Sequence, residues 1–224
     1  TGNNLAGNVM YGIELGVLYR GERELCFLPL AHAYSCAFNF LVPMAVGAHV
    51  YLLGKVPSPK ILLKAFEEVK PNLILTVPLI LEKIYKKMIL PQLSKTTMKV
   101  ALNIPLLDSR IYAQIRKKLV DAFAGRFREV IVGGAAMNEE VTNFLYKIKF
   151  PFTIGYGMTE CGPLISYDHN DEYVPGSCGQ ILKGIMKVRI DSEDPYNKVG
   201  EIQVSGENVM KGYYKNEEAT SKVF

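Results

Sequence analysis

Apolar residues recur along the chain in short runs that are separated by amphipathic stretches. The runs are rich in Val, Ile and Leu, which is typical of strands buried in a parallel sheet. They lie at residues 25–28, 48–53, 72–77, 129–132 and 150–154. Between them, apolar positions three or four residues apart predict helices. Alternating strands and helices predict an α/β fold, with a mostly parallel sheet flanked by helices.

Capping residues mark where several of these helices begin. Ser58 followed by Pro59 suits a helix start, because Ser can cap the first turn and Pro fits its first position. Pro78 opens the next helix, and residues 90–107 predict an irregular helical connection. Either Asp108 or Ser109 is expected to cap a later helix. Asn138 is expected to cap the one that follows, with two Glu residues in its first turn.

The pattern changes after about residue 165. Residues 187–190 and 201–204 alternate polar and apolar positions, and a turn-rich segment separates them. This predicts an antiparallel pair of strands. We therefore expect an α/β portion over residues 1–165 and a small antiparallel β subdomain over residues 166–224.

One stretch is long enough to raise the question of a membrane span. No Asp, Glu, Lys or Arg occurs between Glu24 and Lys55. Pro29 and Pro43 interrupt the run, and its His, Asn and Gly residues add polarity. A buried strand–helix–strand unit is therefore the favoured interpretation.

Composition narrows the class of protein. The chain has 26 Lys and Arg against 22 Asp and Glu, and no segment concentrates the net charge of +4. Nucleic acid is therefore not the expected partner. The four cysteines show no CxxC spacing, which argues against a zinc module and favours reduced, packed thiols in a cytoplasmic protein. No secretory signal is visible at Thr1, and no terminating element precedes Phe224, so we expect a piece of a longer protein.

Two glycine-bearing turns follow predicted strands, at residues 132–136 and 154–160. Ligands of parallel sheets bind at the carboxyl ends of the strands, and glycine lets the backbone approach them closely. In the second turn, Tyr156 offers an aromatic face, Thr159 a hydroxyl for a phosphate, and Glu160 a carboxylate for Mg²⁺. Tight turns that packing alone requires would also explain both glycine clusters.

Several common motifs are absent from the sequence. It contains no GxGxxG fingerprint, no GxxxxGK[ST] loop and no GxSxG elbow. A dinucleotide-binding fold of that type and a nucleophilic hydrolase therefore have no local support.

The second turn reads Tyr-Gly-Met-Thr-Glu at 156–160, which resembles the YGxTE signature of the adenylate-forming superfamily. Gly133-Gly134-Ala135 is similar to the GGA segment of that superfamily. Residues 200–206 and 209–214 resemble its GEIxVxGxxVxxGYY motif, and residues 216–224 fit the segment after it. The three motifs occur in the family's order, so the resemblance covers essentially the whole chain.

The resemblance implies roles for individual residues. Glu160 would bind Mg²⁺, and Thr159 and Glu160 would be catalytic. The residues that would line the nucleotide site are Gly133, Gly134, Ala135, Tyr156, Gly157, Met158 and Thr159. His32 would lie near the acyl and pantetheine tunnel, although a histidine hydrogen-bonded within the core is an equally good interpretation.

Two further segments favour the long-chain fatty acyl-CoA synthetase branch. Residues 28–34 are similar to its LPLAHxxE/Y segment, and residues 77–85 to its VPRxxEKIY segment, with Leu79 in place of the usual Arg. The resemblance implies that ATP, a fatty acid and coenzyme A are substrates, and that Mg²⁺ assists. Peripheral membrane contact of the intact protein would be consistent with such an acid.

By the same resemblance, the phosphate loop lies before Thr1, and the ribose-binding Asp and the adenylation Lys lie after Phe224. We therefore predict that this chain alone is folded, catalytically inactive, weak in nucleotide binding and prone to self-association. Two alternatives stay open: an adenylate-forming enzyme for another carboxylic acid, and a noncatalytic nucleotide-binding or scaffold module.

Overall fold

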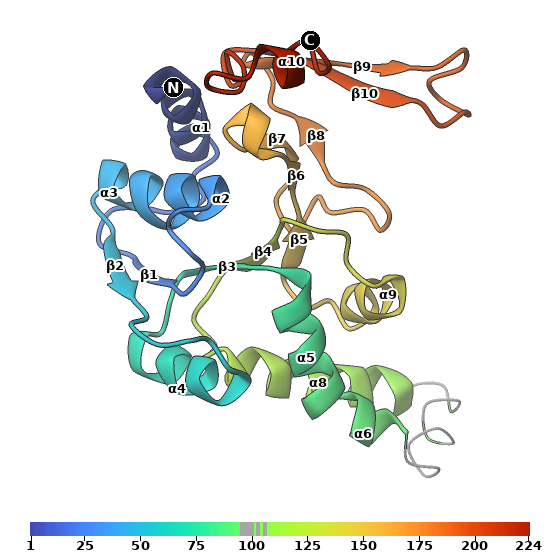
Figure 1. The fold of residues 1–224 in the computed structure, drawn as a ribbon. Helices are drawn as coiled ribbons and strands as arrows, with labels where there is room; N and C mark the ends of the chain where they lie inside the picture. Colours follow the sequence, from blue (N-terminus) through green and yellow to red (C-terminus); the bar gives the residue numbers. More distant parts are fainter. Residues whose placement is uncertain (95–100, 102–103, 105–106) are drawn as a thin grey trace.

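The computed structural model of the protein describes residues 1–94, 101, 104 and 107–224. At its centre is a five-stranded parallel sheet with the strand order β2-β1-β3-β4-β5 (Figure 1). The strands are β1 (Arg23–Cys26), β2 (His49–Leu52), β3 (Leu73–Thr76), β4 (Glu129–Val132) and β5 (Phe152–Ile154). This sheet confirms the predicted α/β class and its parallel pairing.

The central strands are buried on both faces. Successive side chains of a strand point to opposite sides, so each strand contributes to two cores. Leu73 and Leu75 of β3 pack into one hydrophobic cluster, whereas Ile74 packs into the other. In β4, Ile131 and Val132 are divided in the same way. The continuous apolar runs of the sequence follow from this double burial.

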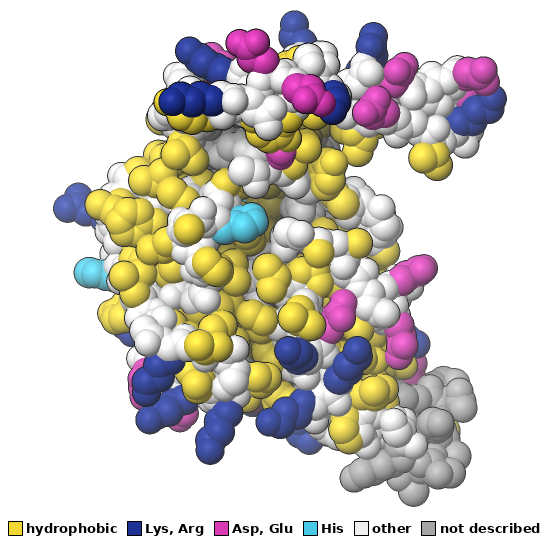
Figure 2. All heavy atoms as spheres, viewed as in Figure 1, with side chains coloured by type: hydrophobic (Ala, Val, Ile, Leu, Met, Phe, Trp, Pro, Cys, Tyr) yellow, Lys and Arg dark blue, Asp and Glu magenta, His cyan; other side chains and the backbone are white. Residues whose placement is uncertain are grey.

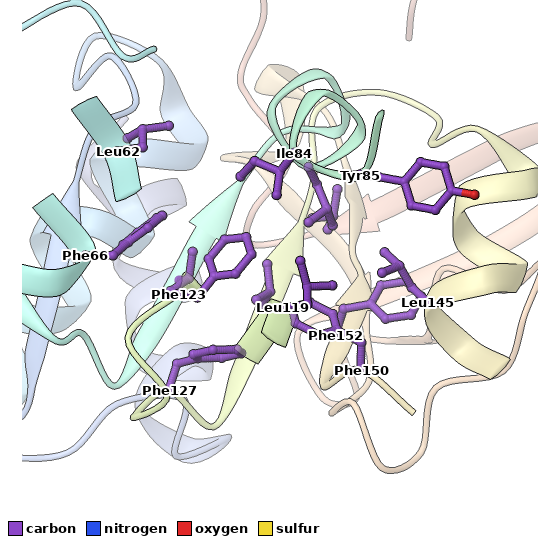
Figure 3. Close-up of a cluster of buried hydrophobic side chains, with 14 of the residues drawn as sticks. Leu62, Phe66, Ile84, Tyr85, Leu119, Phe123, Phe127, Leu145, Phe150 and Phe152 are labelled. Atoms are coloured by element: carbon purple, nitrogen blue, oxygen red, sulfur yellow. The ribbon is translucent and has the colours of Figure 1, made fainter. Parts of the chain in front are cut away.

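Helices cover one face of the sheet. They are α4 (Pro59–Val69), α5 (Pro78–Met88), α8 (Leu107–Ala122) and α9 (Glu139–Lys147). Figure 3 shows their apolar side chains meeting a group of phenylalanines under the sheet. The ring centroids of Phe66 and Phe123 are 5.2 Å apart, and Phe123 lies 5.8 Å from both Phe127 and Phe150.

The opposite face is covered by mixed structure. Helix α1 (Gly2–Glu14) packs there beside a helical segment over residues 33–46 (Figure 1). That segment consists of α2 (Ala33–Ser35), the π-helix η1 (Cys36–Leu41) and α3 (Val42–Val46). An antiparallel sheet completes the layer, made of β6 (Tyr156–Gly157), β7 (Leu164–Tyr167) and β8 (Gln180–Ile181).

The C-terminal part confirms the predicted antiparallel pair. Strands β9 (Met186–Asp191) and β10 (Glu201–Gly206) form a hairpin that extends away from the central sheet (Figure 1). Among the described residues, the other short helices are α6 (Leu90–Leu93), the 3₁₀-helix η2 (Thr159–Cys161) and α10 (Glu217–Thr220). The division into residues 1–165 and 166–224 stays a prediction.

The predicted helix starts are partly confirmed. The Ser58 hydroxyl accepts a hydrogen bond from the backbone N–H of Ile61, and the Asn138 side chain accepts one from Val141. The predicted cap of α8 is wrong, because α8 already begins at Leu107 and both Asp108 and Ser109 lie inside its first turn. Much of the predicted irregular connection lies outside the described residues.

The charge-free run between Glu24 and Lys55 forms β1, the helical segment and β2, as predicted. The expected burial of its last strand is wrong: His49, Tyr51 and Leu52 of β2 are exposed. The reason is that β2 lies at the edge of the sheet and pairs, among the described strands, only with β1. Among the described residues, no helix has both the length and the apolar character needed to cross a membrane.

Candidate functional site

A cleft lies where the central strands end. The backbone N–H of Gly133, directly after β4, donates to the carbonyl of Thr76, and that of Gly155, directly after β5, donates to Val132. Figure 2 shows the same face as Figure 1, with hydrophobic side chains around a hollow near its middle. The predicted site residues that line the cleft are His32, Gly133, Gly134, Tyr156, Gly157, Met158 and Thr159.

Two predicted site residues lie beside the cleft rather than in its lining. Ala135 is exposed and follows the two lining glycines. Glu160 follows Thr159 in the short helix η2 and is half-buried. The structure therefore brings both glycine-bearing turns together at one end of the sheet, with Glu160 directly after the lining residue Thr159.

The glycines serve backbone geometry as well as the cleft. A Cβ atom at Gly157 would lie 2.1 Å from the carbonyl oxygen of Pro163, because the backbones of the antiparallel β6 and β7 approach closely there. Gly134 has a φ of +89°, a conformation that favours glycine. The packing interpretation of these turns is thus supported at both positions, and it is compatible with a cleft.

His32 lies at the start of α2 and is exposed, so the alternative of a histidine within the core is wrong. Its Nδ1 accepts a hydrogen bond from the backbone N–H of Tyr34 at 3.3 Å. The ring thereby caps the helix and also lines the cleft.

Tyr34 is a lining residue that sequence reasoning missed. Its hydroxyl donates to the carbonyl of Ile131 in β4 at 3.2 Å, and burial raises the pKa of this phenol. A Cβ atom at Gly133 would lie 3.3 Å from the Tyr34 ring, so the tyrosine forms a wall against the glycine turn. The sequence signal for this role was its place in the 28–34 segment, two residues after His32.

Glu160 has a partner that lies far away in sequence. The hydroxyl of Tyr213 donates to Glu160 Oε1 at 2.7 Å, and this hydrogen bond raises the pKa of the phenol. The backbone N–H of Met210 donates to the carbonyl of Glu160 at 2.7 Å. The segment after β10 therefore holds Glu160 through both its side chain and its backbone.

The donor set at Glu160 suits a hard cation that is shared with a substrate. In the part of the chain that the structure describes, no three His, Cys, Asp or Glu side chains gather as a metal site. A cation there would have one protein carboxylate, with phosphate oxygens and water as its other ligands. Mg²⁺ is commonly bound in this way, so the residues fit the ion that the resemblance implies.

Comparison with known proteins settles the family. Residues 2–214 match the family model described as AMP-binding enzyme, which spans all three motifs that carry the resemblance. The chain belongs to the AMP-binding enzyme family. The match ends at Tyr214, so the fit of residues 216–224 stays a prediction.

Relatives of this AMP-binding chain act on different acids, according to their names. It is 27% identical to Long-chain-fatty-acid–CoA ligase 1 of Saccharomyces cerevisiae, over 90% of this chain and 32% of the relative. It is 28% identical to a 4-coumarate–CoA ligase of Pinus taeda, over 88% of this chain and 33% of that relative. The chain thus spans about a third of the length of these relatives.

A solved structure shows the same fold. The crystal structure of ATP-bound MatB from Rhodopseudomonas palustris matches this chain at a TM-score of 0.73 and 21% identity, over 99% of this chain and 39% of that structure. The AMP-binding family and this fold confirm the predicted resemblance to adenylate-forming enzymes. They do not separate the fatty-acid branch from the 4-coumarate branch.

Proposed function

We propose that this chain is part of an ATP-dependent acid–CoA ligase that acts on long-chain fatty acids. In the first step, a carboxylate oxygen of the acid attacks the α-phosphorus of ATP, and pyrophosphate leaves. In the second, the thiol of coenzyme A loses its proton and attacks the acyl carbon, and AMP leaves. The observation that carries the proposal is the cleft at the ends of β4 and β5, in a chain of the AMP-binding family.

The chain's own residues would act mainly by position and electrostatics. The glycine turn after β4 leaves room for a flat base, and Tyr156 supplies an aromatic side chain in the same lining. Thr159 is exposed in the cleft and can donate its hydroxyl proton to a phosphate or carboxylate oxygen. Glu160 would hold Mg²⁺, which supplies positive charge to the phosphates when it is bound.

The acid is the finer part of the proposal. The segments around His32 and Pro78 resemble fatty acyl-CoA synthetases, and one relative is named as a long-chain-fatty-acid ligase. The 4-coumarate ligase, equally similar, favours an aryl acid as the second candidate. A cytoplasmic enzyme with peripheral membrane contact would suit a long-chain acid, which partitions into bilayers.

A panel of acids tests the proposal in the full-length protein. With ATP, Mg²⁺ and coenzyme A, we expect acid-dependent pyrophosphate exchange and thioester formation that improve from hexanoate to palmitate. Each buried methylene adds about 0.8 kcal/mol of binding free energy. Faster turnover of 4-coumarate than of palmitate would establish the aryl alternative. The absence of exchange with every acid would indicate a noncatalytic module.

The Glu160→Gln variant tests the metal role in the same assay. The amide keeps the size of the carboxylate and can still accept a hydrogen bond from Tyr213, but it removes the charge. We expect acid-dependent exchange to fall by more than tenfold while the thermal midpoint changes little. Exchange within tenfold of the wild type would show that Glu160 does not hold the cation.

A further inference from the structure

Glu160 is connected to a segment that lies outside the lining of the cleft. We define the latch as residues 207–220, which follow β10. Asn4 of α1 donates to the carbonyls of Glu207 and Val209 in the latch, both at 2.8 Å. From the same helix, Asn8 donates to the carbonyl of Cys161, next to Glu160, at 3.2 Å. Helix α1 therefore ties the latch and the η2 turn to one rigid element.

Within the latch, the backbone of Tyr213 is fixed by a hydrogen bond to α10. Its backbone N–H donates to Thr220 Oγ1 at 2.9 Å, and that hydroxyl donates to the carbonyl of Asn216 at 2.8 Å. Gly212 has a φ of +138°, and a Cβ atom there would lie 2.7 Å from Thr220 Cγ2. The chain before Tyr213 can thus fold tightly onto α10, which fixes where the tyrosine points.

The two carboxylate oxygens of Glu160 differ in their hydrogen bonding. Oε1 accepts the hydrogen bond from Tyr213, whereas no described residue donates to Oε2. Hydrogen bonds to a ligating carboxylate orient it, and removing such a partner typically lowers metal affinity 10- to 100-fold. A free carboxylate rotates, but one held at Oε1 presents Oε2 in one direction.

We propose that Tyr213 is a positioning residue that orients the Glu160 carboxylate toward a divalent cation on the bound nucleotide. The inference rests on the proposed function, because it assumes that Glu160 is the protein ligand of that cation. It adds the latch to the site, although no residue of the latch lines the cleft.

A purely structural role predicts a different outcome. Tyr213 is 38% exposed, and an exposed hydrogen bond contributes little to folding. Loss of its hydroxyl should therefore leave the thermal midpoint nearly unchanged. Metal affinity is the quantity that only the positioning role would change.

The test compares Tyr213→Phe, Tyr214→Phe and Glu160→Gln in the full-length protein. Tyr214 is the matched control, since it is adjacent, 88% exposed, and contacts Lys215 through its ring. Binding of Mn²⁺ in the presence of ATP is measured by electron paramagnetic resonance. We expect the dissociation constant of Mn²⁺ to be 10- to 100-fold larger for Tyr213→Phe and unchanged for Tyr214→Phe. Saturating Mg²⁺ should restore most of the exchange rate of Tyr213→Phe.

Comparing the three variants separates failure of this inference from failure of the proposed function. If Glu160→Gln weakens Mn²⁺ binding and Tyr213→Phe does not, the positioning role is overturned and the metal role of Glu160 stands. If Glu160→Gln has no effect on Mn²⁺ binding, both fail. If Tyr213→Phe lowers the thermal midpoint and its exchange rate stays low at saturating Mg²⁺, the tyrosine is structural and the inference is overturned.

Discussion

Glu129 is buried at the first position of β4, at the opposite end of the strand from the cleft, with 3% of its surface exposed. The hydroxyl of Tyr167 donates a hydrogen bond to Glu129 Oε1 at 2.6 Å, and the backbone N–H of Asn170 donates one to Oε2 at 3.1 Å. His169 Nδ1 lies 3.3 Å from Oε1, and its Nε2 lies 2.9 Å from the carbonyl of Leu15.

These contacts shift the pKa values of both Glu129 and His169. Burial alone would raise the pKa of Glu129, but the hydrogen bonds from His169, Tyr167 and Asn170 together lower it below its ordinary value. The hydrogen bond to Glu129 raises the pKa of His169 to about 9, against the effect of burial. At neutral pH the two residues therefore form a charged pair that joins β4 to the loop after β7 and to the end of α1.

The pair predicts a pH dependence of stability. Because the pKa of His169 is higher in the folded chain than its ordinary value of about 6.5, protonation stabilises the fold. This contribution is complete below about pH 6.5 and is lost as the pH rises through about 9. We expect His169→Gln to lower the free energy of unfolding by on the order of 1 kcal/mol at pH 6 and by little at pH 10. The effect at pH 6 is small because solvent screens the pair.

Denaturant unfolding between pH 6 and pH 10 measures this difference. His49→Gln is the control, because His49 is exposed on β2 and should not change the profile. A constant difference between wild type and His169→Gln across the whole range would contradict the charged pair.

The residues of the site differed in how far the sequence predicted them. The two glycine turns were found because each lies directly after a strand, where a local pattern marks the end of the sheet, and Thr159 was found because it belongs to the second turn. Tyr213 was not, since its contact with Glu160 joins positions 53 residues apart. Such a pair depends on where the chain returns after β10, and no local spacing encodes that path.

At the scale of elements, the apolar pattern of residues 33–46 predicts a single helix. The structure instead has two short α-helices with a π-helix between them. That π-helix, η1, carries the fully buried Asn39. The Asn39 amide donates to Oε1 of Glu24, also fully buried, at 2.6 Å. Ser35 Oγ lies 3.0 Å from Asn39 Oδ1. Burial raises the pKa of Glu24 well above its ordinary value, which favours the uncharged form of this side chain.

The buried hydrogen bond between Asn39 and Glu24 makes a specific prediction about two variants. In Glu24→Gln, the amide oxygen can still accept from Asn39, and burial already disfavours a charge at this position, so the free energy of unfolding should stay within about 1 kcal/mol of wild type. Asn39→Leu removes the partner of both Glu24 and Ser35 and should cost about 1–3 kcal/mol. Urea unfolding at pH 7 compares them. Equal destabilisation by both substitutions would show that the carboxyl group itself, not the hydrogen bond, is required.

The elements that the sequence predicted well are those with local signals. Ser58, Pro78 and Asn138 mark helix starts through contacts within one turn, so their positions were found to within a residue. The π-helix was not predicted; it carries the buried Asn39, whose hydrogen-bond partner in β1 lies 15 residues away along the chain. The exposure of β2 was missed because its composition resembles that of a central strand, and only the strand order reveals an edge.

At the scale of the whole molecule, the layers explain why one cleft can combine residues from four separate segments. The parallel sheet brings the ends of β4 and β5 together, α2 adds His32 and Tyr34, and the antiparallel sheet closes the lining with Leu164. Figure 1 shows α1 near the latch, on the same side of the sheet as β6 and β7. Parallel pairing was predictable from the alternation of strands and helices, whereas the packing of α1 on the latch required the structure.

The same architecture leaves β2 as an edge strand with apolar side chains in solvent. Leu52 is 61% exposed and Tyr51 is 42% exposed. Among the described strands, β2 pairs only with β1, so its outer backbone groups can pair with another strand. We therefore expect the 224-residue chain to self-associate through this edge, as the sequence predicted for an isolated piece.

Sedimentation velocity over a range of concentrations tests this expectation with Leu52→Lys. A lysine on the edge should weaken association at least tenfold, about 1.4 kcal/mol, because pairing would bury its charge. Val56→Lys is the matched control: Val56 is 84% exposed but lies beyond the end of β2, so its variant should associate like the wild type. Equal effects of the two lysines would indicate that added charge alone prevents association. A wild-type chain that is monomeric at every concentration would show that the exposed edge is already protected by its short length of four residues.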